Sequence, residues 1–168
     1  MLGLSSLVLA TPQLWSLFLG LIPATVGILF RTWASGHLRK NECLATSGPY
    51  AYTRNPLYFG SFLLGTGFSL ATGRPVLVVI FILFFLTVYW SVMRTEAEHM
   101  KHLFGDKYTR YAEDVPLFWP SLKPWPASVK AEFDPALYFR YREYRALIGM
   151  LAAIAFLAVR VYWPIWRF

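Results

Sequence analysis

The chain has 168 residues, of which 57% are hydrophobic, 18% aromatic and only 15% charged. Soluble domains average about a quarter charged residues, so this composition excludes an ordinary soluble domain and favours an integral membrane protein. The net charge is +7, but the basic residues flank apolar runs, so membrane lipids are better partners than nucleic acid. A single cysteine, Cys43, excludes an intramolecular disulfide and a cysteine-based metal cluster.

Four apolar segments predict membrane-spanning helices. Residues 1–30 carry no charged side chain, and this run exceeds the about 20 residues that one span needs. Arg31 is expected to end it. The three further segments are residues 57–73, 76–93 and 146–166. The second segment contains the glycines that we expect to allow close helix approach, Gly60, Gly65 and Gly67.

The two long polar segments, residues 31–56 and 94–145, hold thirteen of the sixteen Lys and Arg residues. Positively charged loops favour the cytoplasm, so both segments are predicted to be cytoplasmic. Residues 94–114 predict a polar helix, and residues 127–145 predict a helix that lies along the membrane interface. The predicted fold class is therefore all-α, a bundle of about four transmembrane helices with interfacial helices at the cytoplasmic face.

The stretch at residues 48–60 is polar, turn-rich and aromatic, and it separates two apolar segments. Proline follows both Gly48 and Asn55, so neither end continues a regular helix. We expect a stiffened loop that holds Arg54 and Asn55 beside the membrane. A simple interfacial turn, whose tyrosines anchor the helix ends, is the alternative interpretation.

Two blocks of residues combine into a recognisable pattern. The first block contains Gly48, Pro49, Tyr50, Arg54, Asn55, Pro56, Tyr58 and Gly60. The second contains Glu96, Phe104, Gly105, Tyr108, Tyr111, Val115, Pro116 and Pro120. Together they resemble the isoprenylcysteine carboxyl methyltransferase family and its phospholipid N-methyltransferase relatives. The resemblance predicts one membrane methyltransferase domain over residues 1–168, with core motifs at 31–120 and an interfacial and a final transmembrane helix within 127–168.

Two positions depart from the family pattern. Asn55 stands where the family usually has histidine, and Ala97 stands where it usually has a second glutamate. An asparagine forms hydrogen bonds but does not titrate near neutral pH, so a binding role survives at this position and a proton-carrying role does not. Glu98 follows one position later, but on a helix it lies about 200° from Glu96 and does not replace the missing partner.

The resemblance implies S-adenosylmethionine as the cofactor and a lipophilic methyl acceptor, such as the carboxylate of a prenylated cysteine or a lipid headgroup. Arg94 and Glu96 are the implied catalytic residues. No metal site is expected, because the histidines match no standard ligand spacing. The implied cofactor-binding residues are His37, Gly48, Pro49, Tyr50, Arg54, Asn55, Pro56, Tyr58, Glu96 and Tyr108.

The residue types suit this cofactor. Glu96 can pair with its ammonium group, and Arg54 can bind its carboxylate through two parallel hydrogen bonds. Tyr50 and Tyr58 can cover the adenine or face the sulfonium by cation–π attraction. Ordinary structural roles stay open, since Arg54 could bind a lipid phosphate and Glu96 could pair with a lysine or arginine along its helix.

Two other functions compete. Membrane sterol reductases, which use NADPH, resemble this chain in a similar loop, but the Leu103-Phe104-Gly105 stretch favours methyl transfer. A non-enzymatic lipid-binding protein is the second alternative, suggested by Arg140, Arg142 and Arg145 beside the last apolar segment. The predicted location is an integral membrane protein with its active site at the cytoplasmic face.

Overall fold

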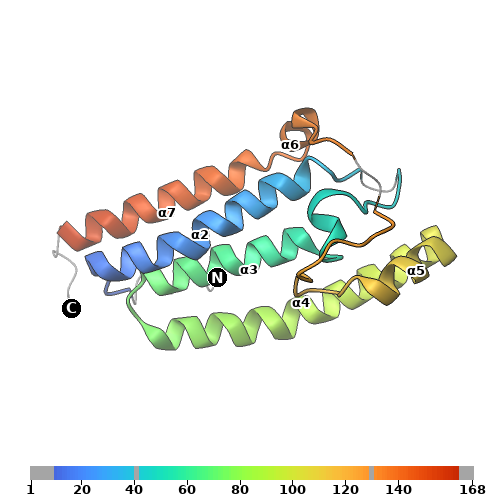
Figure 1. Ribbon diagram of the computed structural model, residues 1–168. Helices are drawn as coiled ribbons and strands as arrows, with labels where there is room; N and C mark the ends of the chain where they lie inside the picture. Colours follow the sequence, from blue (N-terminus) through green and yellow to red (C-terminus); the bar gives the residue numbers. More distant parts are fainter. Residues whose placement is uncertain (1–9, 40–41, 129–130, 163–168) are drawn as a thin grey trace.

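The computed structural model describes residues 10–39, 42–128 and 131–162, and within these ranges it contains helices and no strand. Four long helices lie side by side in a bundle (Figure 1). They are α2 (Leu14–Ser35), α3 (Pro56–Ala71), α4 (Pro75–Phe104) and α7 (Tyr144–Tyr162). The predicted all-α class is confirmed, while the outer parts of the first and last predicted segments lie outside the described residues.

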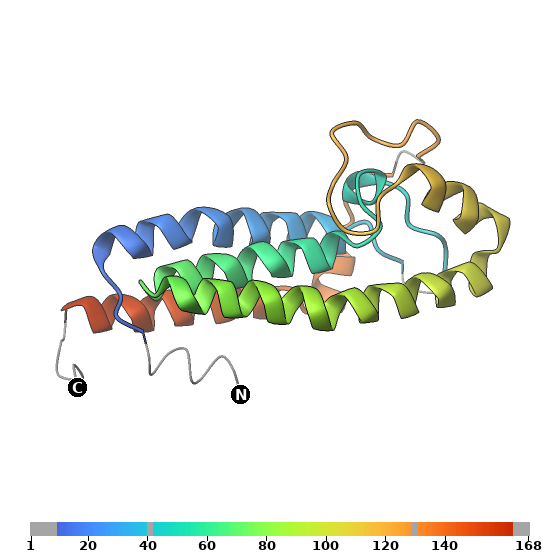
Figure 2. The ribbon, with the colours of Figure 1, turned by 90° about the horizontal axis from the view of Figure 1, so that it is seen from below.

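Short elements gather at one end of this bundle. These are the 3-10 helix η1 (Gly48–Ala51) and the helices α5 (Asp106–Asp114) and α6 (Pro135–Arg140). Figures 1 and 2, which view the molecule from two directions, agree that the polar segments before α3 and between α4 and α7 meet at this end. This arrangement brings the two motif blocks to the same end of the bundle.

Three of the helices, α2, α4 and α7, are long and apolar enough to cross a membrane. Helix α3 has only 16 residues, which corresponds to about 24 Å, and a full span needs about 20 residues. It nevertheless packs against both α2 and α4 within the bundle. A fourth span therefore stays a prediction.

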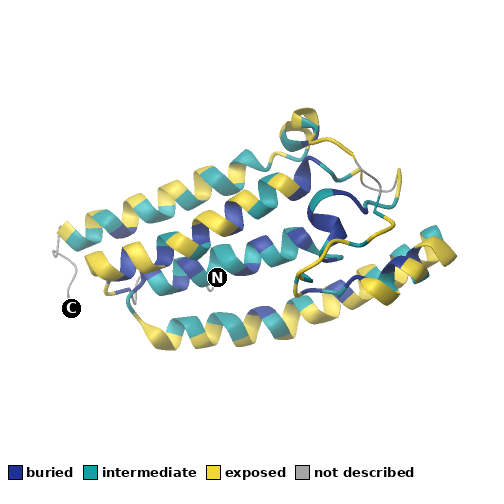
Figure 3. Ribbon diagram, viewed as in Figure 1, coloured by how far each residue is buried: buried dark blue, intermediate teal, exposed yellow. Residues whose placement is uncertain are grey.

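The outer surface of the bundle is apolar. Helices α4 and α7 show mostly exposed and half-buried positions along their lengths (Figure 3). Large apolar side chains occupy these positions, as they do on the outer face of α2: Phe18, Ile22, Leu83, Ile148 and Val159 are each more than half exposed. Such a surface suits hydrocarbon and not water.

Helix α4 corrects the prediction of a separate polar helix at residues 94–114. The helix continues through Arg94 to Phe104 because no proline or glycine interrupts it, and its 30 residues extend about 45 Å. It ends at Gly105, whose φ of 55° is strained for residues with a side chain. Helix α5 then begins at Asp106. Because a hydrocarbon core is about 30 Å thick, the last turns of α4, including Glu96, project beyond it.

The predicted interfacial helix at residues 127–145 is also shorter in the structure. Only the six residues of α6 are helical before α7 begins. Asp134 caps α6 by accepting a hydrogen bond from the backbone N–H of Ala136 at 2.9 Å, and Pro135 occupies the first helical position. Arg142, with φ 56°, separates α6 from α7. The expected end of the first span at Arg31 is wrong as well, since α2 continues to Ser35.

Glycines hold α2 and α3 in close contact. A Cβ atom added at Gly67 would lie 2.5 Å from the backbone oxygen of Gly20 and 2.5 Å from the backbone nitrogen of Ala24. One added at Gly60 would lie 2.8 Å from the backbone oxygen of Gly27. The predicted role of the α3 glycines in close helix approach is confirmed. This contact fixes the start of α3, and with it the preceding loop, against α2.

Candidate active site

The two motif blocks are joined by hydrogen bonds between residues 50–55 and residues 111–125. Three of these bonds connect backbone groups: Arg54 N–H donates to the Pro116 carbonyl (2.9 Å), Ser121 N–H to that of Tyr52 (2.8 Å) and Trp125 N–H to that of Ala51 (2.8 Å). The segment after α5 is therefore fastened along the loop that precedes α3.

Three side chains strengthen this connection. The Thr53 hydroxyl donates to the Phe118 carbonyl at 2.9 Å, and the Tyr111 hydroxyl donates to the Tyr50 carbonyl at 2.6 Å. The Asn55 amide nitrogen donates to the Leu117 carbonyl at 2.9 Å. Thr53 and Tyr111 are almost fully buried, so these bonds are shielded from water and hold the loop rigidly.

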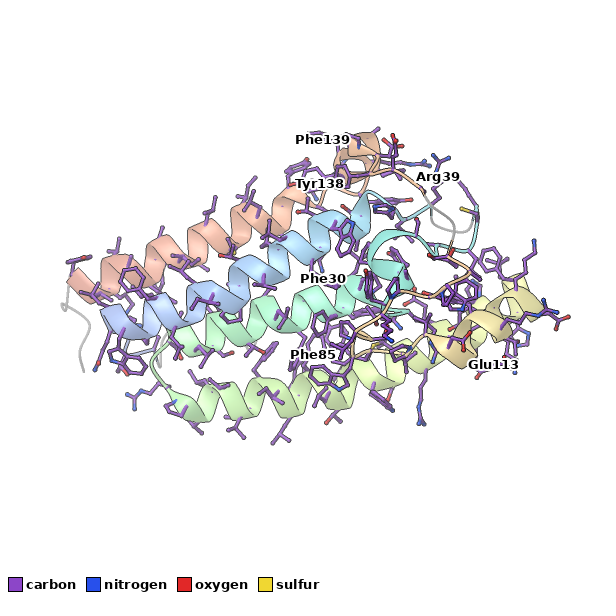
Figure 4. All side chains as sticks on the ribbon, in the orientation of Figure 1. Phe30, Arg39, Phe85, Glu113, Tyr138 and Phe139 are labelled. Atoms are coloured by element: carbon purple, nitrogen blue, oxygen red, sulfur yellow. The ribbon has the colours of Figure 1, made fainter. Side chains whose placement is uncertain are left out.

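A cavity of about 950 Å³ lies beside this paired structure. Its walls come from the segment after α2, the loop and first turns of α3, the last turns of α4, and α5. Figure 4 places Arg39, from the segment after α2, and Glu113, from α5, at this same end of the molecule. Seven of the predicted cofactor-binding residues line the cavity: Tyr50, Arg54, Asn55, Pro56, Tyr58, Glu96 and Tyr108.

Three predicted cofactor-binding residues lie behind the wall and support it. His37 is hydrogen-bonded through Nδ1 to the Ser47 hydroxyl at 3.1 Å, and burial lowers the pKa of its imidazole. Its ring fills the space beside Gly48, where a Cβ would lie 2.6 Å from the ring. Pro49 is buried within η1. These residues shape the loop without lining the cavity.

Arg94, predicted to be catalytic, does not line the cavity either. Its side chain is exposed, and its guanidinium carbon lies 5.6 Å from the centre of the Trp90 ring. A cation–π contact of this kind is typical of an arginine near a membrane surface. The geometry therefore gives a catalytic role for Arg94 no support.

Arg54 is the cation best placed to bind a ligand. Its Nη1 donates to the Tyr108 hydroxyl at 3.3 Å, and its guanidinium carbon lies 5.9 Å from the centre of the same ring. Its Nε is buried and has no hydrogen-bond partner among the described residues. An unsatisfied buried donor costs about 1–3 kcal/mol, so an anionic ligand group would complete this site.

Glu96 supplies the negative charge, and it is the one carboxylate that the cavity's described walls contain. Its side chain is exposed, and the Tyr58 phenol lies beside it and interacts with it. Ala97 also lines the cavity, whereas Glu98 does not. At the position where the family usually has a second glutamate, this chain therefore exposes the methyl side chain of Ala97 to the cavity.

The buried phenols of Tyr50 and Tyr111 do not serve as bases. Burial raises the pKa of Tyr50 far above its usual range, and the neighbouring Tyr111 and Glu96 raise it further. Burial likewise raises the pKa of Tyr111, with Tyr108 adding to the shift and Arg54 opposing it. Both hydroxyls therefore stay protonated at neutral pH.

Several residues of the cavity were not predicted from the sequence. On α4, the lining residues Tyr89, Val92 and Met100 lie three or four positions from one another or from the predicted Glu96, and this helical spacing would have revealed them once one helix was assumed. Arg31 also lines the cavity and pairs with Glu143. No local pattern connects two residues 112 positions apart.

Comparison with known proteins supports the resemblance. Residues 27–107 match the family model of phospholipid methyltransferases. The chain therefore resembles the phospholipid methyltransferase family over a little under half of its length. No solved structure matches it.

The curated relatives that this chain matches carry two kinds of name. The human protein-S-isoprenylcysteine O-methyltransferase is 33% identical over 59% of this chain and 35% of its own length. The enzyme of the same name from Schizosaccharomyces pombe is 34% identical over 46% and 33% respectively. A cobalt-zinc-cadmium resistance protein of Cupriavidus metallidurans is 32% identical over 63% and 50%. The chain thus matches half or less of the length of these relatives.

The resistance protein's name raises the question of a metal. Among the residues that the structure describes, no group of three or more His, Cys, Asp or Glu side chains is arranged to hold a metal ion. Such a group is the usual minimum for a protein metal centre. The cavity walls instead combine one carboxylate, several arginines and tyrosine rings, which suits an organic ligand.

Replacing Asn55 tests whether its side chain acts by holding the loop in place or by transferring a proton. We expect Asn55→Ala to weaken cofactor binding, because the bond to the Leu117 carbonyl that joins the two blocks is lost. Asn55→His should retain binding and turnover, because a neutral imidazole can donate the same bond. Cofactor affinity and turnover measured between about pH 6 and 9 would check both variants. A large rise in turnover for Asn55→His that follows a histidine ionisation near about pH 6.5 would contradict the positioning role.

Proposed function

We propose that the chain is an integral membrane methyltransferase that transfers a methyl group from S-adenosylmethionine to a lipophilic acceptor. One observation carries this proposal: Arg54, with a buried and unpartnered Nε, and Glu96 line the same aromatic cavity. Adenosylmethionine carries a carboxylate, an ammonium, a sulfonium and an adenine ring, and the cavity offers a group of matching chemistry for each.

The roles of the residues follow from these charges. Arg54 would bind the cofactor's carboxylate and Glu96 its ammonium, both through charge-assisted hydrogen bonds. The rings of Tyr58 and Tyr108, which line the cavity, would contact the adenine and the sulfonium. Asn55 would keep the loop in place through its bond to the Leu117 carbonyl. When bound, the cofactor supplies an electrophilic methyl group on a positively charged sulfur.

The chain's own residues would contribute alignment and exclusion of water more than proton transfer. The Tyr50 and Tyr111 hydroxyls stay protonated, so neither is a base at neutral pH. An acceptor carboxylate attacks with its own lone pair and needs no base. Because neither buried phenol can act as a base, the site favours an ionised carboxylate acceptor, such as that of a prenylated cysteine, over an acceptor that must first lose a proton.

A second hollow supports a lipophilic acceptor. A groove of about 350 Å³ runs between α2, α3 and α7, and Ser61 lines both this groove and the cavity. Along α3 it extends from Ser61 to Ala71, about 15 Å, or half of the about 30 Å hydrocarbon core. Its other walls are small or apolar: Gly20, Leu21, Ala24, Leu64, Gly65, Gly67, Phe68, Ala146, Gly149, Met150, Ala153 and Ile154.

The orientation in the membrane belongs to the same proposal. The end of the bundle that carries the cavity also carries the two segments richest in lysine and arginine. Since such segments favour the cytoplasm, we infer that the cavity opens to the cytoplasm, where adenosylmethionine would be available. The acceptor would reach it from the adjoining leaflet.

Calorimetric titration of the purified chain in detergent with adenosylmethionine and, separately, with NADPH tests this function. We expect binding of adenosylmethionine and none of NADPH. Binding of NADPH alone would favour a reductase, and binding of neither would favour a non-enzymatic lipid-binding protein. Either of these results would reject the proposed methyl transfer.

A further inference from the structure

Arg31 is the most fully bonded cation at the cavity wall. Its Nε and Nη2 donate to the Glu143 carboxylate at 2.7 to 3.0 Å in a bidentate ion pair. Its Nη1 donates to the Leu57 carbonyl at 3.3 Å and to the Ser61 hydroxyl. The guanidinium thus uses each of its three nitrogens, and no donor group is left for a substrate. Arg31 therefore contributes to the site by holding together the helices that it joins.

Three helices meet at this guanidinium. Arg31 belongs to α2, Leu57 and Ser61 to α3, and Glu143 immediately precedes α7. The side chain crosses α3 at Gly60, where an added Cβ would lie 2.6 Å from the Arg31 Cγ. Ser61 lines both the cavity and the groove, so the ion pair lies at their junction.

The ion pair attaches the start of α7 directly to α2, beside the backbone bond from Asp134 to the Gly36 carbonyl that holds the segment before α6. The one buried residue in the described length of α7 is Leu157, near the other end, where it packs with Ala10, Leu17 and Ala71. Between Leu157 and Glu143, small residues of α7 leave the groove open against α2 and α3. The Arg31 and Glu143 side chains are only 20% and 12% exposed, and a shielded ion pair of good geometry serves to specify an arrangement.

We propose that Arg31 and Glu143 are positioning residues for the lipophilic acceptor. By fixing the start of α7 over the groove, the pair sets the width of the passage through which the acceptor's reactive group reaches the cavity. This inference rests on the proposed function for its acceptor. The attachment of α7 itself can be measured without any turnover.

Spin-label distances in lipid nanodiscs test the attachment. With Cys43 replaced by serine, one label pair at Leu29 and Ile148 reports the end near the ion pair, and another at Phe18 and Val159 reports the opposite end. All four positions are more than half exposed. In Glu143→Gln we expect the first distance distribution to broaden and lengthen, while the second stays unchanged. Glu143→Asp, which keeps the charge, should stay close to the native distribution.

A matched control is available at the same end of the molecule. Glu42 pairs with Arg140 at 3.6 Å, but these side chains are 54% and 65% exposed, and exposed pairs contribute little. Glu42→Gln should therefore leave both distances unchanged. An unchanged first distance in Glu143→Gln, or equal changes at both ends, would overturn the proposal.

A kinetic test distinguishes an effect on acceptor binding from an effect on cofactor binding. With N-acetyl-S-farnesylcysteine as the acceptor probe, Glu143→Gln should raise KM about tenfold and leave the adenosylmethionine Kd unchanged. A parallel loss of cofactor affinity would overturn the positioning role. If the native chain binds no adenosylmethionine, the proposed function fails, and the label distances still decide whether the pair positions α7.

Discussion

Substituting alanine for Glu96 or for Arg54 is expected to weaken adenosylmethionine binding roughly 10- to 150-fold, because losing a hydrogen bond to a charged group costs about 1.5–3 kcal/mol. Both side chains line the cavity, and the buried Nε of Arg54 has no partner among the described residues. Calorimetric titration of each variant, with helix content checked by circular dichroism, would measure the loss.

Two nearby residues provide matched controls. Glu98 lies two positions from Glu96 on the same helix, and Arg94 carries the same charge as Arg54, but neither lines the cavity. Glu98→Ala and Arg94→Ala should therefore bind the cofactor as the native chain does. Native affinity in well-folded Glu96→Ala and Arg54→Ala would remove both residues from the proposed site.

The largest expected effect on stability comes from Gly67→Ala. The new Cβ would lie 2.5 Å from two backbone atoms of α2, the oxygen of Gly20 and the nitrogen of Ala24. Backbone atoms cannot move aside as a flexible side chain does, so we expect a cost of about 3 kcal/mol, the upper end of the range for overpacking. Unfolding of the purified variant in mixed detergent micelles would measure it.

Gly149→Ala is the control for this substitution. An added Cβ at Gly149, within α7, would meet nothing within 4 Å. Replacing glycine by alanine inside a helix then stabilises by roughly 0.5–1 kcal/mol. The two substitutions should thus change stability in opposite directions. Equal effects of Gly67→Ala and Gly149→Ala would show that α2 and α3 are not in close contact.

Local signals in the sequence predicted much of this fold. Apolar runs and the glycines of α3 predicted the helices and their close approach, because each depends on residues that are near one another in the chain. The end of α4 was missed because Gly105 was not recognised as the break, although its positive φ stops the helix. The short α6 was overextended because aromatic and charged residues at 127–145 resemble an interfacial helix.

The site was predictable where the family pattern covers it. That pattern pointed to Arg54 and Glu96, and in the structure both side chains line one cavity. It also pointed to His37 and Gly48, which support the wall from behind. The Arg31–Glu143 pair was not predictable, because Glu143 follows the matched segment of residues 27–107 and contacts Arg31 only through the tertiary fold.

The hydrogen bonds between residues 50–55 and 111–125 have a consequence for biogenesis. Helices α2 and α3 emerge from the ribosome before α4 and α5 and can pair through their glycines as soon as both are in the membrane. At that stage the carbonyl groups of residues 50–52 have no hydrogen-bond donors, because the residues that donate to them have not yet been translated. These donors are Tyr111, Trp125 and Ser121. The nascent chain therefore has a helical hairpin before it has a complete cavity wall, because the last donor, Trp125, is translated 54 residues after the end of α3 at Ala71.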